Sequence, residues 1–254
     1  MLYKAKTLKN YKLNCLDGEI GKVKEFYFDD HHWAIRYLIV DTGNWLQDKQ
    51  VLISPYALGQ VNKEEQYINV DLTRKQIENS PSLDCDKPVS RQFEETYYDY
   101  YGWPIYWSGS NMWGSFAHIE HDNKKWEKST QGQKALDPNL RSTHDVNGYD
   151  IQAKDGEIGH IEDFIIDDET WAIRYVSIDT GTWWPGKKIL VSPQWVENIS
   201  WNESKVFVNL PLETIKQSPE YTEKSLLTRE YETGLHKHYN HQGYWVNESP
   251  AREK

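Results

Sequence analysis

The chain of 254 residues carries 29 basic and 39 acidic side chains, and its length suits two small domains or one large one. The net charge of −10 repels the phosphate backbone of nucleic acids, so we expect no nucleic-acid partner. Two cysteines, Cys15 and Cys85, are too few for a disulfide framework. No apolar stretch approaches the ~18 residues that a membrane span needs, so we expect a cytoplasmic protein without membrane insertion.

The sequence repeats itself in one constant register. Asp17 opens a DGEIG segment that returns from Asp155, at an offset of 138 residues. Further segments return at the same offset, with no insertion or deletion between them. An unbroken match of this length predicts two tandem copies of one structural unit. The paired segments are 17–21 with 155–159, 29–30 with 167–168, 33–37 with 171–175, 41–43 with 179–181, 54–55 with 192–193 and 80–81 with 218–219.

The first copy predicts short strands separated by turns. Gly18 and Gly21 predict a turn at 17–21, because glycine tolerates positive φ. The strand at 33–40 is apolar on both faces apart from one arginine, so we expect it to be buried on both sides. Thr73, with Gln76 three residues later, is a capping-box pattern that predicts a short helix ending near residue 80. The expected strands are 22–28, 33–40, 50–53, one that begins at 60–61, and 67–72.

The composition also favours strands. Aromatic residues make up 14% of the chain, and such side chains fit a pleated sheet better than a helix. Five or six short strands bury little apolar surface in an open sheet, whereas closing the sheet removes its exposed edges. We therefore expect an all-β chain of two small β-barrels.

An aromatic segment follows each copy. Residues 91–107 hold Phe93, Tyr97 and Tyr101 at helical spacing, which predicts a short amphipathic helix that buries these three rings. Residues 227–254 form a related C-terminal helical tail. Between the copies, residues 108–140 are rich in polar and small side chains, which predicts a flexible linker.

Both copies resemble the PRC-barrel domain family. The resemblance rests on an Asp-Asp pair, a Trp-x-x-Arg-Tyr strand, an Asp-Thr-Gly turn and two Ser-Pro pairs in each copy. It implies two tandem small PRC-type β-barrels, over residues 1–90 and 141–226, each followed by its aromatic helix or tail. The family includes the cytoplasmic domain of the photosynthetic reaction-centre H subunit and the C-terminal domain of a ribosome-maturation factor. Both are accessory modules that contact proteins.

Arg36 and its counterpart Arg174 each interrupt an apolar strand that acidic residues flank. One hypothesis makes each arginine a receptor for an anion at a barrel mouth. The interpretation we favour is structural, either an ion pair that fixes the strand register or a side chain that extends along an outer face.

Two groups of histidines have residue types that bind metals. The DDHH segment at 29–32 is one, but the second copy has no histidine there, and a hairpin turn is the simpler interpretation. His236, His238 and His241 are the other candidates. On a helix, His236 and His238 point about 200° apart, so they cannot bind one ion unless the helix ends between them. We therefore expect no metal site.

The tail aromatics have two interpretations. Tyr98, Tyr106 and Trp107 are the candidates for contact with a protein partner, because aromatic residues anchor protein interfaces. Alternatively, the tail packs on its own barrel or on the other barrel and enlarges a small core.

No phosphate-binding loop, nucleophile elbow or HExxH helix is present in the sequence, so we expect neither a cofactor nor an enzyme. We interpret the chain as a non-catalytic protein-interaction or regulatory module whose partner is a protein, with a homodimer left open. The resemblance suggests an alternative, an accessory subunit that docks on the cytoplasmic face of a membrane electron-transfer or photosynthetic complex. A hydrolytic or metal-dependent enzyme is the third hypothesis. The candidate interaction residues are Tyr98, Tyr106, Trp107, Arg36 and Arg174.

Overall fold

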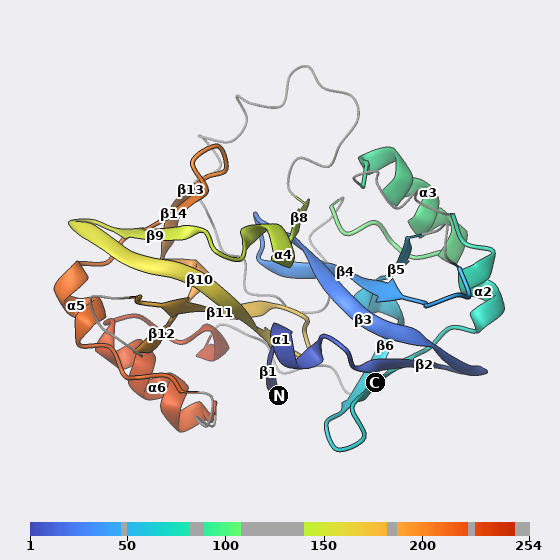
Figure 1. The fold of residues 1–254 in the computed structure, drawn as a ribbon, viewed down its shortest axis with the longest axis horizontal. Helices are drawn as coiled ribbons and strands as arrows, with labels where there is room; N and C mark the ends of the chain where they lie inside the picture. The colour runs from blue at the N-terminus through green and yellow to red at the C-terminus, as the bar shows by residue number, and fades with distance from the viewer. Residues whose placement is uncertain (47–49, 82–88, 108–139, 182–186, 223–226, 247–254) are drawn as a thin grey trace. The chain divides into compact units, whose positions relative to one another are not determined.

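The computed structural model describes residues 1–46, 50–81, 89–107, 140–181, 187–222 and 227–246 (Figure 1). The chain divides into two compact units, which we call the N-unit (Thr7–Ser142) and the C-unit (Met1–Lys6 with Thr143–Pro250). The predicted linker, apart from its last residue, lies outside the described residues, as does the end of the C-terminal tail.

The N-unit is built on a seven-stranded mixed sheet of order β5-β4-β3-β2-β7-β6. Neighbouring strands run antiparallel except β2 and β7, which pair in parallel. β8 pairs with the far end of β3, beyond the residues that pair with β2. The strands are β2 (Lys12–Cys15), β3 (Gly18–Asp29), β4 (Ala34–Asp41), β5 (Val51–Ile53), β6 (Leu58–Asn62), β7 (Tyr67–Val70) and β8 (Leu140–Ser142).

The C-unit repeats this topology with the order β12-β11-β10-β9-β14-β13, and β1 pairs with β10. The parallel pair is β14 with β9, the counterpart of β7 with β2. The prediction of a mostly β chain with two related units is therefore confirmed. The strands are β1 (Leu2–Lys4), β9 (Asp150–Ala153), β10 (Gly156–Asp167), β11 (Ile173–Asp179), β12 (Lys188–Val191), β13 (Val196–Ser200) and β14 (Lys205–Val208).

Short helices accompany each sheet. The capping box at Thr73 and Gln76 is present, and the helix that it predicted is α2. The Ser90 hydroxyl accepts a hydrogen bond from the Phe93 N–H at 3.1 Å and starts the predicted aromatic helix, α3. The α-helices are α1 (Ala5–Leu8), α2 (Arg74–Glu78), α3 (Arg91–Tyr101), α4 (Thr143–Val146), α5 (Leu212–Lys216) and α6 (Arg229–His238), and the 3₁₀ turns are Pro55–Ala57, Pro193–Trp195 and Tyr244–Val246.

The turn between β3 and β4 runs from the Asp29-Asp30 pair to Trp33, and both of its ends have a structural role. The Asp29 carboxylate accepts hydrogen bonds from the backbone N–H groups of His31 and His32, at 2.9 and 3.3 Å. Trp33 closes the turn with a φ of +53°, an uncommon value for a bulky residue, and its indole is buried. The strand that follows is buried along Ala34–Val40, as predicted.

Gly21, expected in a turn, lies inside β3 instead. Its φ is +138°, and a Cβ atom there would stand 2.1 Å from the carbonyl oxygen of Asp41. A Cβ atom at Gly159 would likewise stand 2.0 Å from the carbonyl oxygen of Asp179. The glycine is therefore required because the end of the next strand approaches the backbone too closely for any side chain.

The sheets do not close into barrels in the described residues, and that prediction is wrong there. β5 and β6 lie at opposite ends of the N-unit sheet without pairing. The α3 helix instead protects the edge of β5. The Tyr97 hydroxyl donates to the Leu52 carbonyl at 2.9 Å and accepts from the Ser54 N–H at 3.3 Å. A covered edge no longer offers a template for unwanted strand pairing, so closure is not needed for that purpose.

The two repeats exchange their first strands. β1 belongs to the first repeat by sequence but pairs with β10, with Leu2 opposite Asp167. β8 begins the second repeat but pairs with β3, with Leu140 opposite Asp29. Leu140 follows Leu2 by the repeat offset of 138, so the two exchanged strands are equivalent. The units therefore differ from the expected boundaries of 1–90 and 141–226 at both junctions.

Polar contacts hold each exchanged strand. In the C-unit, the Lys6 N–H donates to the Asp163 carboxylate at 3.1 Å. In the N-unit, Arg141 pairs with Asp30 at 3.0 Å. The Ser142 hydroxyl donates a hydrogen bond to the Glu25 carboxylate at 2.6 Å. These contacts fix the register of three-residue strands, whose backbone hydrogen bonds alone are few.

We expect the two halves of the chain to stay together after the connection between the repeats is cut. A protease site inserted within residues 108–139 yields two fragments, each of which supplies a strand to the other's sheet. The fragments should co-elute in size-exclusion chromatography without denaturant. Removing residues 1–4 from the same variant deletes one exchanged strand and should release the fragments at a lower urea concentration. Fragments that separate on cleavage would contradict the exchange.

Candidate functional site

Arg36 lies in the middle of β4 and is fully buried. Its guanidinium Nη2 is 2.9 Å from Asp29 Oδ2, and the guanidinium carbon lies 4.0 Å from the centre of the Tyr106 ring. Burial alone would raise the pKa of Asp29, but the hydrogen bond from His32 and the charge of Arg36 outweigh it and hold that pKa well below its ordinary value. Of the two structural alternatives, Arg36 forms the ion pair and does not extend along an outer face, so its charge is matched inside the protein.

A buried carboxylate lies next to this ion pair. Glu94, on α3, is completely buried. Its Oε1 accepts hydrogen bonds from the hydroxyls of Tyr37 and Tyr106, at 2.9 and 2.6 Å, and Arg91 Nη1 lies 3.2 Å from its Oε2. Because Tyr37 is on β4 and Glu94 on α3, the carboxylate joins the aromatic tail to the sheet. The contacts offset the cost of burying a charge.

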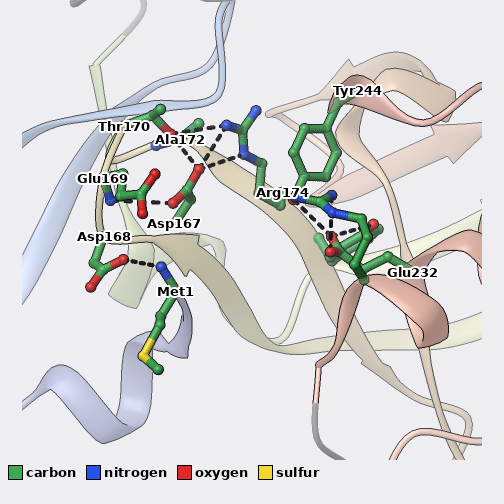
Figure 2. Close-up of polar contacts among 11 residues, drawn as sticks. Met1, Asp167, Asp168, Glu169, Thr170, Ala172, Arg174, Glu232 and Tyr244 are labelled. Carbon is green, nitrogen blue, oxygen red and sulfur yellow. Dashed lines mark hydrogen bonds and ion pairs between the residues drawn. The ribbon is translucent and has the colours of Figure 1, made fainter. Parts of the chain in front are cut away.

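The C-unit has the same arrangement at the repeat offset. Arg174 pairs with Asp167 at 2.7 Å and with the Thr170 hydroxyl at 3.0 Å, and its guanidinium lies 4.0 Å from the Tyr244 ring centre (Figure 2). Glu232 accepts from the Tyr175 and Tyr244 hydroxyls at 3.0 and 2.7 Å, and Arg229 lies 3.1 Å from it. We call each set the buried arginine–glutamate cluster of its unit. The N-unit set is Asp29, Arg36, Tyr37, Arg91, Glu94 and Tyr106, and the C-unit set is Asp167, Arg174, Tyr175, Arg229, Glu232 and Tyr244.

The prediction that Tyr98 and Tyr106 face a partner is wrong. Tyr98 is fully buried and Tyr106 is 3% exposed, while Trp107 is half-buried beneath the Arg91 guanidinium at 4.1 Å. Arg36 and Arg174 are also buried, so neither is an anion receptor at the surface. Four of the five candidate interaction residues therefore belong to the interior.

The helix face was also predicted imperfectly. Tyr97 is buried as expected, but Phe93 and Tyr101 are only half-buried. Glu94 and Tyr98, which lie outside the face predicted to be buried, are fully buried as well. The carboxylate of Glu94 points inward because three polar side chains bind it there. The spacing of apolar residues alone cannot reveal such contacts.

The candidate histidines have other roles. His236 is buried, with Nε2 3.0 Å from the Tyr175 hydroxyl and Nδ1 3.1 Å from the Gln242 carbonyl. His238 lies 2.8 Å from the Thr214 carbonyl, and His241 stacks on Trp195 with ring centres 5.3 Å apart. In the part of the chain that the structure describes, no group of three or more histidine, cysteine, aspartate or glutamate side chains is placed to hold a metal ion.

A surface depression of about 540 Å³ lies on the N-unit and was not predicted. We call it the aromatic depression and define it by Tyr56, Asp71, Tyr100, Tyr101 and Trp103. Tyr100 is 41% exposed, and the other three rings are half-buried. The αL conformation at the end of α3, with a φ of +67° at a glycine, turns the chain so that the tryptophan returns to the side of the helix. The Gly102-Trp103 pair is the sequence signal that could have indicated this depression.

Comparison with known proteins agrees with this architecture. Residues 14–77 and 138–215, together more than half of the chain, match the model of the PRC-barrel domain family. The chain belongs to this family. An uncharacterized protein of Deinococcus radiodurans is 30% identical to the PRC-barrel chain over 78 residues, which are 31% of this chain and 28% of the relative. The match therefore spans less than a third of that relative's length.

The helices in the described parts of the PRC-barrel chain are all too short or too polar to cross a membrane.

The C-unit should lose stability in weak acid because of one histidine. Burial lowers the pKa of His236 to about 4 from an ordinary value of 6.5. The unfolded chain therefore binds this proton more tightly, so the histidine's contribution is full above about pH 6.5 and falls as the pH drops towards 4. The N-unit has Tyr98 at the equivalent position, so His236→Tyr introduces the residue of the first repeat.

Urea unfolding at pH 7 and pH 5 measures this effect. The native protein should lose about 2 kcal/mol more than His236→Tyr between these two pH values. Other titrating groups are common to both proteins and cancel in the comparison. An equal loss in the two proteins would show that His236 does not titrate in this range.

Proposed function

We propose that this PRC-barrel chain is a non-catalytic protein-interaction module of the cytoplasm, with its contact surface on the N-unit. The observation that carries the proposal is the aromatic depression, where the rings of Tyr56, Tyr100 and Trp103 reach solvent beside the exposed Asp71 carboxylate. Exposed aromatic side chains are typical anchors of protein interfaces.

A second observation supports the same surface. Leu16 is 69% exposed and lines a smaller depression of about 300 Å³, which also includes Asp71. Tyr100 and Leu16 are both large exposed hydrophobic side chains, and a single carboxylate lies between their depressions. Apolar side chains that gather on one surface in this way favour an interaction site over scattered exposure.

The polar residues that first suggested a site support a division of roles. Arg36 and Arg174 are each neutralised by a buried aspartate and covered by a tyrosine ring. Glu94 and Glu232 are each surrounded by three polar partners. These groups stabilise the two units and leave the surface of the N-unit to bind a partner.

The test uses the second repeat as the source of matched substitutions. Tyr100 and Trp103 correspond to His238 and His241, so the variant Tyr100→His/Trp103→His carries side chains that the same fold tolerates. Full-length native and variant proteins are used as bait in a lysate of the source organism, and cross-linked partners are identified by mass spectrometry. A partner cross-linked near residues 100–103 of the native protein should be lost with the variant. Equal capture by both baits, or no cross-link to this surface, would reject the proposal.

A further inference from the structure

The walls of the aromatic depression are held by contacts within the N-unit. Trp103 stacks between two tyrosines. Its ring centre is 4.4 Å from that of Tyr101, with planes 13° apart, and 5.6 Å from that of Tyr56, with planes 23° apart. Tyr100 stands edge-on to Tyr101, and its hydroxyl donates to the Gln76 carbonyl at 3.0 Å. Such a wall needs little ordering when a ligand binds, which favours affinity.

Within the described residues, the carboxylate at this depression has no ion-pair partner. Asp71 is exposed, and no lysine or arginine in the described ranges pairs with its side chain. The surface thus combines flat aromatic faces with an unmatched negative charge. Cations bind to aromatic faces through the ring quadrupole, and a nearby carboxylate strengthens that preference.

The protein shows which cation suits this combination. At four places in the described structure, an arginine lies between a ring and a carboxylate. The guanidinium carbon is 4.0–4.3 Å from the ring centre, and a guanidinium nitrogen is 2.7–3.2 Å from the carboxylate. The sets are Arg36 with Tyr106 and Asp29, Arg91 with Trp107 and Glu94, Arg174 with Tyr244 and Asp167, and Arg229 with Trp245 and Glu232.

The second repeat differs from the first at two positions of this surface. Asp71 corresponds to Asn209, and Ala57 at the floor of the depression corresponds to Trp195. The Trp195 indole is buried against Tyr239 and His241, which are the counterparts of Tyr101 and Trp103. The C-unit therefore fills this space with the Trp195 indole, and an uncharged asparagine replaces the aspartate.

The neighbouring depression indicates the size of the ligand. It shares Asp71 with the aromatic depression and contains Leu16. A peptide can place an arginine on the ring stack and an apolar side chain against Leu16, whereas a small free cation fills the first position alone. A planar guanidinium also stacks on flat rings and meets a carboxylate with two N–H groups.

We propose that the aromatic depression binds an arginine side chain of the protein partner, packed against the exposed ring of Tyr100 beside Trp103 and paired with Asp71. This inference rests on the proposed function and identifies the chemistry of its partner.

The test is an NMR titration of the full-length protein labelled with ¹⁵N at its tryptophan indoles. The probes are N-acetyl-arginine amide and N-acetyl-citrulline amide, which match in shape but differ in charge. The Trp103 resonance, assigned from a Trp103→His variant, should shift with the arginine probe at millimolar concentration and respond little to citrulline. Asp71→Asn, which introduces the residue of the second repeat, should weaken arginine binding about threefold.

Each outcome decides between alternatives. Equal shifts with the two probes, or an affinity unchanged by Asp71→Asn, would reject arginine recognition. Tighter binding of tetramethylammonium than of the arginine probe would assign the depression to small quaternary ammonium compounds instead. If the arginine probe fails while the Tyr100→His/Trp103→His bait still loses its partner, the interaction function stands and only the arginine chemistry is wrong.

Discussion

A buried glutamate on each tail helix fixes the arrangement of the unit around it. Glu94 and Glu232 each accept hydrogen bonds from two tyrosine hydroxyls and pair with an arginine one turn earlier. Without these partners the buried charge would be costly, so the helix can dock in only one position. The same docking in the N-unit brings Tyr97 over the edge of β5 and Tyr106 beneath Arg36.

The repeats share this scaffold and differ at their surfaces. Asp71, Ala57 and Trp103 of the N-unit become asparagine, tryptophan and histidine in the C-unit, while the clusters keep the same residues at the same offset. A duplicated PRC-barrel chain thus preserves the interactions that hold its elements and is free to change the rest. The fold alone therefore does not determine what such a scaffold does.

The sequence predicted what local patterns control. The constant offset of 138 residues predicted the two units. The apolar segment at 33–40 predicted the buried strand β4, and the capping box at Thr73 predicted α2. The strand exchange could not be predicted, because Leu2 and Leu140 begin equivalent strands, and the sequence does not show which of them pairs with β3 and which with β10. The buried face of α3 was predicted only in part, since the partner of Glu94 is Tyr37, 57 residues earlier. Tyr244-Trp245, at the repeat offset from Tyr106-Trp107, was an available sign that these aromatics are structural.

A double-mutant cycle between Tyr37 and Glu94 tests the role of the buried carboxylate most directly. Tyr37→Phe, Glu94→Met and the double variant are compared with the native protein by urea unfolding, with the signal taken from the N-unit. A hydrogen bond to a buried charged group predicts a coupling energy of about 1.5–3 kcal/mol. A coupling energy below about 0.5 kcal/mol, the value for independent sites, would contradict the account that this contact joins the aromatic helix to the sheet.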